Sequence, residues 1–444
     1  MIASRAERLS GWGRHPVQEC RVYRPEKVSE LGEVMASPPE GGVVSRGLGR
    51  AYGDAALNPG GTVVSHLRLN RMLAFDEAAG VLECEGGVSL GEIVDAFLPR
   101  GWFLPVVPGT RHVTIGGAIA ADVHGKNHHR DGTFGRFVDA IRLVTPGRGM
   151  LTCSREQEAD AFRATLGGMG LTGAIVSARL RLTRVESAWM TVDQLPTRDL
   201  DDALARFADA DAGHRYSVAW IDALAKGRAL GRGVLMQGDH APASAAPAKA
   251  TRRTVRGVPF DLPGATLNRF TVGAFNRLYR ATHGARTGAM EPLERFFWPL
   301  DAVADWNRAY GRRGFVQYQL VVPIDRADAL ASVLRRAAES GRASFLAVLK
   351  RFGPAGEGIL SFPMAGWTLS LDFPVASGLT EMLREMDRTV ADAGGRVYLA
   401  KDAMLDAVTF ARMYPAAEAF RAVRRTLDPA GVLTSSLARR VGLA

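Results

Sequence analysis

The chain has 444 residues, 47% hydrophobic and 23% charged, so it is long enough for two or more domains with large cores, and an intrinsically disordered chain is excluded. Its net charge is +10, yet 50 of its 56 basic residues are arginines interleaved with acidic residues, and the sequence has neither a basic tail nor a zinc-finger spacing. These features argue against nucleic-acid binding and leave room for a weak attraction to anionic lipid or to a phosphate-bearing substrate.

The first 187 residues alternate short strand-like and helix-like segments. β-Branched residues and alternating polarity predict the strands, whereas Ser89, Glu92 three residues later and a final Gly101 mark the start and end of one helix. The expected strands cover residues 43–49, 62–69, 80–87 and 174–185, and the expected helices cover residues 89–101 and 158–168. We expect this first domain to end at residue 187, just after its last strand.

Residues 188–395 differ in composition, with five of the seven tryptophans, and form the expected second domain. Within them, residues 238–257 are rich in alanine, proline and charge, which predicts a mobile surface loop or lid. We expect the last segment, 396–444, to return to the first domain. The elements expected in these two parts are a strand at 317–324, a helix at 326–341 and a strand at 396–400.

Three glycine-rich segments carry most of the functional information. RGLGRAYGD (46–54) is one residue off the GxGxxG spacing of a dinucleotide turn, and PGTRHVTIGGAIAADVHGKNHH (108–129) lacks the first glycine of a P-loop. GGMGLTG (167–173) matches GxGxxG, but a helix precedes it and a strand follows, the reverse of a Rossmann fingerprint. Because glycine turns let backbone N–H groups approach an anion closely, three of them in one domain indicate a long phosphate-bearing ligand.

In this order the three motifs resemble the FAD-binding domain of the vanillyl-alcohol-oxidase superfamily, also called PCMH-type. The string HGKNHH points to a smaller family within this superfamily, because it is similar to the corresponding segment of the decaprenylphosphoryl-ribose oxidases. The similarity covers nearly the whole chain, continuing through WNRAYG (306–311), FVQYQLVVP (315–323), LKRFGP (349–354), LSFPMAGWTLSLDFP (360–374), GGRVYLAKD (394–402) and MYP (413–415). The resemblance implies an α+β fold, with two α+β subdomains that clamp FAD and a substrate domain built on a mixed, antiparallel sheet.

The same resemblance implies oxidation of the 2′-hydroxyl of a polyprenylphosphoryl-β-D-ribose to the 2′-ketone, the first half of epimerisation to the arabinose form. The second half would need a separate NAD(P)H-dependent short-chain reductase, which fits the missing Rossmann fingerprint. The residues implied to contact FAD are Arg46, Gly47, Leu48, Gly49, Arg50, Ala51, Gly53, Asp54, Gly109, Thr110, Thr114, Ile115, Gly116, Gly117, Ala121, Asp122, Val123, Ile175 and Tyr398.

Lysine is rare in this arginine-rich chain, and three of its six lysines lie in resemblance motifs. Retained lysine hints at a need for a compact point charge, although a surface lysine is the alternative at each position. By resemblance Lys401, His124 and Tyr52 are the catalytic residues. The implied substrate residues are Lys126, Trp220, Gln317, Gln319, Lys350 and Ser370.

Strand geometry supports one pair of these assignments, and two others leave alternatives open. Gln317 and Gln319 are two apart on a strand and should therefore face the same side, where two amides suit sugar hydroxyls. Trp220 is as compatible with a core position as with the substrate site. His124 and His128 have helical spacing, but Gly125 and the missing glutamate argue against a metal site.

The chain departs from the family pattern on its substrate side. Ser370 stands where mycobacterial-type members carry cysteine, Thr368 replaces asparagine, and Phe297-Trp298 replaces a common Tyr-His pair. These changes put the identity of the lipid and sugar in doubt more than the flavin.

Arg50 replaces the histidine that oxygen-using aldonolactone or alditol oxidases of this fold often link covalently to flavin, which predicts non-covalent FAD. Such an oxidase is the main alternative function. A non-enzymatic protein that binds membrane or nucleic acid through basic residues is the other, but no ladder of aromatic and basic residues supports it.

The cysteines and the N-terminus bear on the cellular location. Cys20, Cys84 and Cys153 form no CxxC pair, which favours small buried side chains in a reducing compartment. No secretory signal is visible, and no apolar run is long enough to span a bilayer. We therefore expect a bacterial protein of the cytoplasm, or one held peripherally at the inner membrane.

Overall fold

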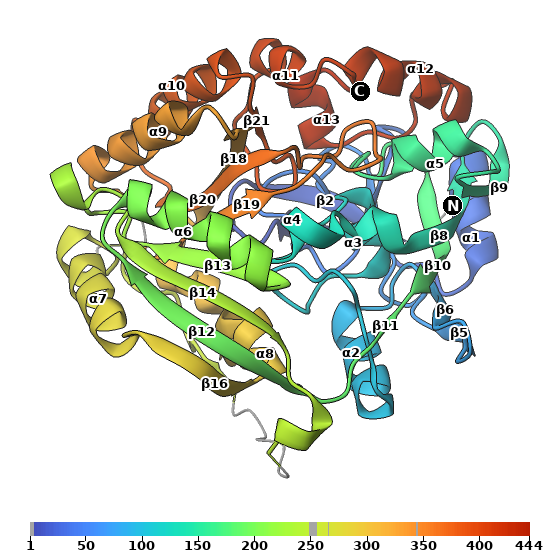
Figure 1. Ribbon diagram of the computed structural model, residues 1–444. Coiled ribbons are helices and arrows are strands. Elements are labelled where there is room, and N and C mark those ends of the chain that lie inside the picture. Colours follow the sequence, from blue (N-terminus) through green and yellow to red (C-terminus); the bar gives the residue numbers. More distant parts are fainter. Residues whose placement is uncertain (1–3, 248–254, 265, 343–344) are drawn as a thin grey trace.

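The computed structural model describes residues 4–247, 255–264, 266–342 and 345–444, and its α+β architecture confirms the expected fold class (Figure 1). The N-terminal half contains a four-stranded sheet and a five-stranded sheet, whereas a single eight-stranded sheet organises the second half. Within the described ranges, each helix is too short or too polar to cross a bilayer.

In the four-stranded sheet, β1 is antiparallel to β2, whereas β2, β4 and β3 are parallel. Its strands in spatial order are β1 (Arg5–Ser10), β2 (Val17–Tyr23), β4 (Thr62–Ser65) and β3 (Val43–Arg46). The second sheet is antiparallel and consists of β5 (Met72–Asp76), β6 (Val81–Glu85), β10 (Ala174–Arg181), β8 (Val138–Thr145) and β9 (Gly149–Ser154). A short ribbon pairs β7 (Trp102–Phe103) with β11 (Thr183–Arg184).

Five helices belong to this half: α1 (Val28–Ala36), α2 (Leu90–Phe97), α3 (Ile115–Ala120), α4 (His128–Asp131) and α5 (Ala159–Thr165). The helix expected after Ser89 forms as α2 with a reciprocal cap. The Ser89 hydroxyl accepts from the Glu92 N–H at 3.1 Å, and the Glu92 carboxylate accepts from the Ser89 N–H at 2.7 Å. Strand and helix signals located β3, β4, β6, β10, α2 and α5, although β3 and β4 end before the expected residues; the other elements of this half were not predicted.

All neighbouring strands of the large sheet are antiparallel. In spatial order they are β16 (Arg286–Pro292), β12 (Trp189–Thr197), β14 (Gly233–His240), β13 (Tyr216–Ile221), β19 (Ala347–Phe352), β20 (Gly366–Pro374), β18 (Phe315–Pro323) and β21 (Arg396–Val397). The accompanying elements are α6 (Leu200–Gly213), α7 (Arg269–Thr282), α8 (Leu293–Phe297), α9 (Ala327–Ser340), α10 (Leu379–Asp392), β15 (Arg256–Gly257) and β17 (Val303–Ala304).

The two faces of the large sheet have different roles, because side chains alternate along a strand. Ala219, Leu349 and Leu371 point into a core shared with α6, α9 and α10, which lie along one face in Figure 1. Their neighbours Trp220 and Lys350 face the opposite side and line a cavity. One sheet thus supplies both the domain core and a wall of the site.

The C-terminal segment contacts both halves of the chain: residues 405–414 pack in the core of the large sheet, whereas the residues after them reach the first half. Val43 is bonded on both sides, since its N–H donates to the Val432 carbonyl at 2.8 Å and its own carbonyl accepts from the Thr434 N–H at 3.0 Å. The helices in this segment are α11 (Ala407–Met413), α12 (Ala417–Leu427) and α13 (Ser436–Val441). Strands and helices distant in sequence are thereby brought to the same cavity.

Two expectations need correction. The loop expected from residue 238 begins later, because Gly238 is still paired in β14 with Val192 and Tyr216; residues 248–254 of that loop lie outside the described ranges. The strand expected at 396–400 ends at Val397, where the backbone turns and the Tyr398 carbonyl accepts from the Lys401 N–H at 2.9 Å.

Candidate active site

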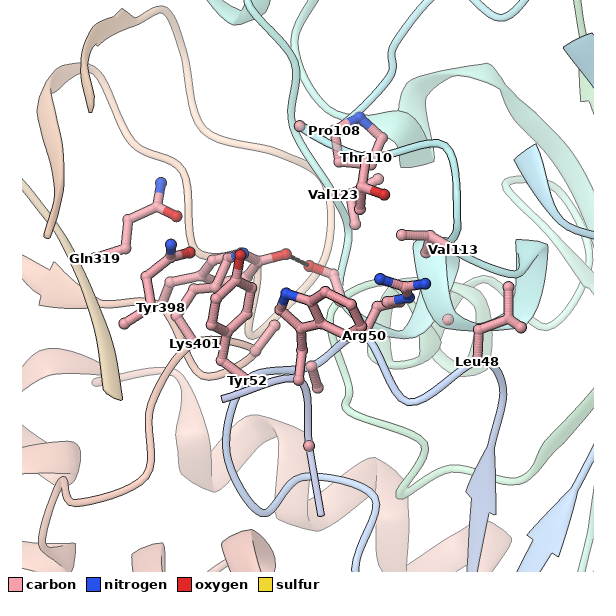
Figure 2. A pocket seen from close by; sticks show the side chains of 18 of the residues that line it. Leu48, Arg50, Tyr52, Pro108, Thr110, Val113, Val123, Gln319, Tyr398 and Lys401 are labelled. Carbon is pink, nitrogen blue, oxygen red and sulfur yellow. Dashed lines mark hydrogen bonds between the residues drawn. The ribbon is translucent and has the colours of Figure 1, made fainter. Parts of the chain in front are cut away.

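One long pocket runs between the glycine-rich loops of the first half and the open face of the large sheet. Figure 2 shows Gln319, Tyr398, Lys401 and Tyr52 gathered toward one end, with Leu48 at the other. The turn that follows β21 supplies two of these side chains, which explains why the backbone leaves the sheet there. The pocket thus joins a backbone-rich channel to a cluster of polar side chains.

The structure brings most of the expected site residues together. All three catalytic candidates and all six substrate candidates line the pocket. Of the expected FAD contacts, the pocket is lined by Arg46, Gly47, Leu48, Gly49, Arg50, Ala51, Gly53, Gly109, Thr110, Thr114, Gly116, Gly117, Ala121, Val123, Ile175 and Tyr398. The side chains of Asp54, Ile115 and Asp122 lie elsewhere.

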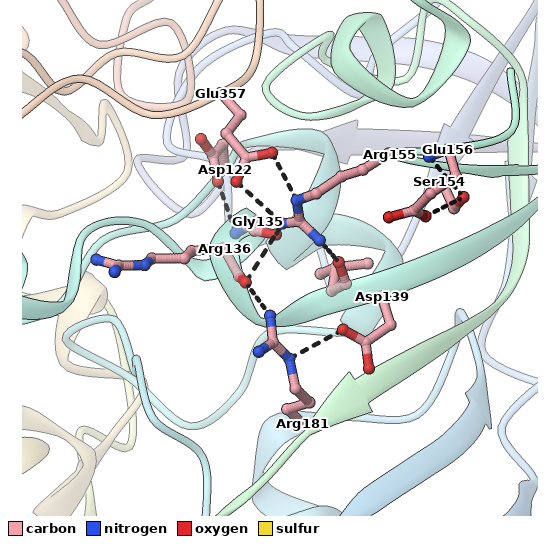
Figure 3. A network of polar contacts seen from close by, with 10 residues as sticks. Asp122, Gly135, Arg136, Asp139, Ser154, Arg155, Glu156, Arg181 and Glu357 are labelled. Atoms are coloured by element: carbon pink, nitrogen blue, oxygen red, sulfur yellow. Dashed lines mark hydrogen bonds and ion pairs between the residues drawn. The ribbon is translucent and has the colours of Figure 1, made fainter. Parts of the chain in front are cut away.

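These three residues have structural partners instead. Asp54 is buried and accepts two hydrogen bonds from Arg440, at 2.7 and 3.1 Å. Ile115 is fully buried in the core under α3. Asp122 is bonded to the Ser361 hydroxyl and accepts from the Gly135 N–H at 2.9 Å, in the polar network of Figure 3.

The network around Asp122 ties the turn at residues 135–138 to a loop of the second half. Arg155 donates to the carbonyls of Gly135 and Val138 and is paired with Glu357 at 2.8 Å (Figure 3). Sequence spacing alone could not show whether Asp122 contacts a ligand or supports the loop, because a polar residue beside the glycine motif can do either.

The channel end of the pocket fits an extended cofactor such as FAD. A Cβ added at Gly109 or at Gly170 would meet no protein atom within 4 Å, so it would project into the channel. Gly170 also has φ +79°, which other residues rarely adopt. At Gly47, by contrast, a Cβ would approach Thr114 Oγ1 to 2.1 Å, so only glycine lets the loop lie this close to α3.

Lys401 is the centre of the polar end. Its ammonium group lies 3.7 Å from the ring centre of Tyr52. Burial, opposed by the nearby Asp372 carboxylate and reinforced by Lys350, lowers the pKa of Lys401 to about 7. Burial raises the pKa of Tyr52 well above its usual value, so the phenol stays protonated. A partly neutral amine and a protonated phenol therefore lie together.

Asp372 was not among the expected residues, although it lies two positions beyond Ser370 on β20. It accepts from Gln317 Nε2 at 2.7 Å and from the Tyr310 hydroxyl at 3.1 Å. Burial raises its pKa to about 7, against the lowering effect of these donors and of Lys401. The alternation that pairs Gln317 with Gln319 could have identified it, because residues 370 and 372 share a face.

His124 has a defined tautomer. Gln319 Nε2 can only donate, and it lies 2.9 Å from His124 Nε2, so that nitrogen accepts and the neutral ring carries its proton on Nδ1. Burial and nearby Lys350 lower the pKa of His124 well below its usual value. Among the described residues Nδ1 has no partner. Buried donors are normally hydrogen-bonded, so the Nδ1–H of His124 is available to an acceptor atom of a cofactor or substrate in the pocket.

Two further amines share the pocket with Lys401. Burial lowers the pKa of Lys350 to about 8, and burial together with Lys350 lowers that of Lys126 to about 7. Lys126 Nζ bonds the Phe296 carbonyl. Each amine would regain its charge beside an anion, so the pocket is complementary to a phosphate group.

Aromatic residues that the sequence analysis did not predict complete the walls of the pocket. The Arg50 guanidinium lies 3.8 Å from the ring centre of Trp12, and Trp220 packs against Tyr279 with ring centres 4.6 Å apart. Trp12 belongs to none of the quoted motifs, and no sequence signal pointed to it. Trp220 serves both interpretations offered above, because it is almost fully buried and still lines the pocket.

His124 and His128, which have helical spacing in the sequence, have different surroundings in the structure. His128 Nδ1 accepts from the Gly353 N–H at 3.2 Å, and the ring centres of His124 and His128 are 6.5 Å apart. In the part of the chain that the structure describes, no three histidine, cysteine, aspartate or glutamate residues are grouped as a metal would require.

Comparison with known proteins agrees with this geometry. The FAD binding domain family matches residues 21–154, and the D-arabinono-1,4-lactone oxidase family matches residues 369–441. The chain is 39% identical to decaprenylphosphoryl-beta-D-ribose oxidase of Mycolicibacterium smegmatis over 98% of both chains. It is 40% identical to an uncharacterized protein from the mprA 5′ region of Streptomyces coelicolor, over 80% of this chain and 100% of that one.

A more distant relative is L-gulono-1,4-lactone dehydrogenase of Mycobacterium tuberculosis, 24% identical over 97% of this chain and 98% of the relative. The pocket, the FAD-domain match and the near full-length similarity agree with one another. The protein is therefore an FAD-dependent oxidoreductase and belongs to the decaprenylphosphoryl-β-D-ribose oxidase family.

Proposed function

We propose that this enzyme oxidises the 2′-hydroxyl of a polyprenylphosphoryl-β-D-ribose to the 2′-ketone. The observation that carries the proposal is the presence of Lys401, Lys350 and Lys126 in one pocket with FAD-channel loops. The amines of Lys350 and Lys126, whose pKa values are lowered by burial, suit a substrate that brings its own negative charge. A neutral lactone brings no such charge, so this feature favours a phosphorylated sugar.

The side chains at the polar end have separate roles in the oxidation of an alcohol. FAD, when bound, supplies the two-electron acceptor for the hydride that leaves the alcohol carbon. Lys401, partly neutral near pH 7, accepts the hydroxyl proton at Nζ as the C=O bond forms. Tyr52, which stays protonated, donates a hydrogen bond to the same oxygen. His124 presents its Nδ1–H as a fixed donor because Gln319 occupies the other nitrogen.

The remaining assignments concern orientation and charge. The glycine loops around Gly47, Gly109 and Gly117 would hold the FAD backbone, which needs close main-chain approach. Lys350 and Lys126 would face the phosphate. Among the expected substrate residues, Trp220 would cover the sugar, with Tyr279 behind it.

The product of this reaction is a ketone, so inversion of the carbon needs a hydride from a second source. We propose that a separate NAD(P)H-dependent short-chain reductase supplies it, because the motif at 167–173 lacks the strand-first context of a nicotinamide site. We also propose peripheral attachment to the bacterial inner membrane, helped by the net charge of +10 near anionic lipid.

Anaerobic mixing with a short-chain polyprenylphosphoryl-ribose tests the reaction, with loss of the yellow flavin absorbance as the readout. We expect rapid bleaching by this substrate and none by L-gulono-1,4-lactone. Lys401→Met should retain FAD and bleach at least a hundredfold more slowly, as for loss of a positioned base. Bleaching by the lactone alone would replace this proposal with the lactone-oxidase alternative.

The two-enzyme scheme has its own test. With substrate and NADH present, the purified enzyme should give keto-sugar and no arabino product. Conversion to the arabinose form with NADH consumption by this chain alone would contradict both the separate reductase and the exclusion of a nicotinamide site.

A further inference from the structure

Helix α7 exposes an apolar face that a globular protein would ordinarily bury. Phe270 is 70% exposed, Leu278 64% and Phe275 41%, and they share one side of the helix with exposed Ala274 and Ala281. Its opposite side is anchored by buried Val272 and Asn276. The helix is therefore docked on the protein through one face, while its apolar residues remain outside. Such a surface is typical of an interaction site.

The charges on α7 are of one sign. Between Arg269 and Thr282 the helix has no acidic residue, and Arg269, Arg277 and Arg280 form no ion pair within the described ranges. Helix α6 differs, since Arg206 pairs there with Asp202 at 3.1 Å. An apolar face bordered on one side by Arg277, with the Arg269 guanidinium 4.7 Å from the ring centre of Phe270, complements an anionic surface with an apolar interior.

The exposed face is continuous with the active site. Tyr279, on the inner side of α7, lines the pocket and packs on Trp220. Phe275 contacts both Tyr279 and Phe345, with ring centres 5.9 and 5.2 Å apart. Apolar side chains thus lead from the pocket wall to the outer surface, where the tail of a lipid substrate could leave the site.

We propose that the outer face of α7 docks the holoenzyme onto an anionic bilayer, with Phe270 and Leu278 inserted below the headgroups and Arg269 and Arg277 at the phosphate level. This inference rests on the proposed lipid-phosphate substrate and names the surface through which it is reached. The pocket wall formed by Tyr279 then faces the membrane from which the substrate is drawn.

Flotation of the FAD-loaded protein with vesicles tests the proposal. The probes are vesicles of phosphatidylcholine alone and vesicles containing one-third phosphatidylglycerol. We expect binding to the anionic vesicles, weakened at least tenfold in Phe270→Ser/Leu278→Ser and roughly fivefold for each arginine changed to glutamine at 269 and 277. Val408→Ser is the matched control, because Val408 is 76% exposed on α11, remote from the pocket; it should bind like the wild type.

Activity separates this surface from the reaction itself. With a short water-soluble substrate the Phe270→Ser/Leu278→Ser variant should bleach FAD at the wild-type rate, whereas with vesicle-borne substrate its KM should rise at least tenfold. Absence of wild-type vesicle binding, equal binding to neutral vesicles, or a dimer that this variant abolishes would each overturn the docking proposal. Failure of the short substrate with every variant and the wild type would instead overturn the proposed reaction.

Discussion

Substitution of Asp372 by asparagine tests how the pocket adjusts its base. Asparagine has nearly the same side-chain shape and can still accept the hydrogen bond from Gln317, but it lacks the negative charge that raises the pKa of Lys401. An opposite charge beside a buried group shifts a pKa by about 1–3 units. Because Asp372 itself has a pKa of about 7 and is only partly ionised there, the lower end of this range applies. We therefore expect the pKa of Lys401 to fall from about 7 to about 6.

The direction of the effect on rate follows from the role of the neutral amine. If Lys401 must accept a proton, kcat/KM rises as the pH passes the pKa of Lys401. The rising part of the profile of kcat/KM against pH, its acid limb, therefore lies near pH 7 in the wild type. Asp372→Asn should move this limb about one pH unit lower, so that the ratio of kcat/KM at pH 6 to that at pH 8 increases by roughly fivefold. Stopped-flow or dye-coupled flavin reduction between pH 5 and 9 measures it.

A second buried carboxylate provides the control. Asp387 also has a pKa raised by burial to about 7, and it accepts from the Tyr318 hydroxyl at 2.9 Å, but unlike Asp372 it does not shift the pKa of Lys401. Asp387→Asn should leave the acid limb where it is. The reasoning is wrong if Asp372→Asn leaves the limb at its wild-type position or moves it to higher pH, or if Asp387→Asn moves it equally.

Three further predictions concern the cofactor, the pocket serine Ser370 and the ion pairs of Arg440 near the C-terminus. Arg50 cannot form a histidyl–flavin link, so acid precipitation should release all flavin into the supernatant; colour retained by the pellet would refute non-covalent binding. Ser370→Cys should give time-dependent inactivation and one mass adduct with a maleimide, whereas the wild type, whose three cysteines are buried, should show neither. Arg440→Met leaves the buried carboxylates of Asp54 and Asp402 without their 2.7 Å partner, so it should destabilise the protein by about 3 kcal/mol and lower its melting temperature; an unchanged melting curve would show that these ion pairs contribute nothing.

The strands around the glycine motifs were predictable because their signals are local. The cap formed by Ser89 and Glu92 and the alternation through residues 317–324 each depend on neighbours a few positions apart. The same alternation placed Gln317 and Gln319 on one face, and both line the pocket. The rarity of lysine directed attention to Lys401, which lies at the polar end.

The residues that were missed or misplaced depend on contacts between distant segments. Asp54 follows a glycine motif, but its partner Arg440 is 386 positions away, and no local pattern predicts that pair. Trp12 lines the pocket, and Asp372 comes close enough to raise the pKa of Lys401, only because loop and sheet meet there. The end of the last strand at Val397 is likewise decided by the turn at Tyr398 and Lys401.

The sequence by itself determined the capped helix and several strands, because periodicity and capping are properties of short segments, and its motifs carried the resemblance that implied the α+β class and the flavin-type glycine loops. Only the tertiary structure decided which polar groups meet and how deeply they are buried, and burial lowers the pKa values of Lys401 and Lys350 and raises that of Asp372. It also decided that the apolar face of α7 stays outside, because which side of an amphipathic helix finds a partner depends on the surface against which it docks.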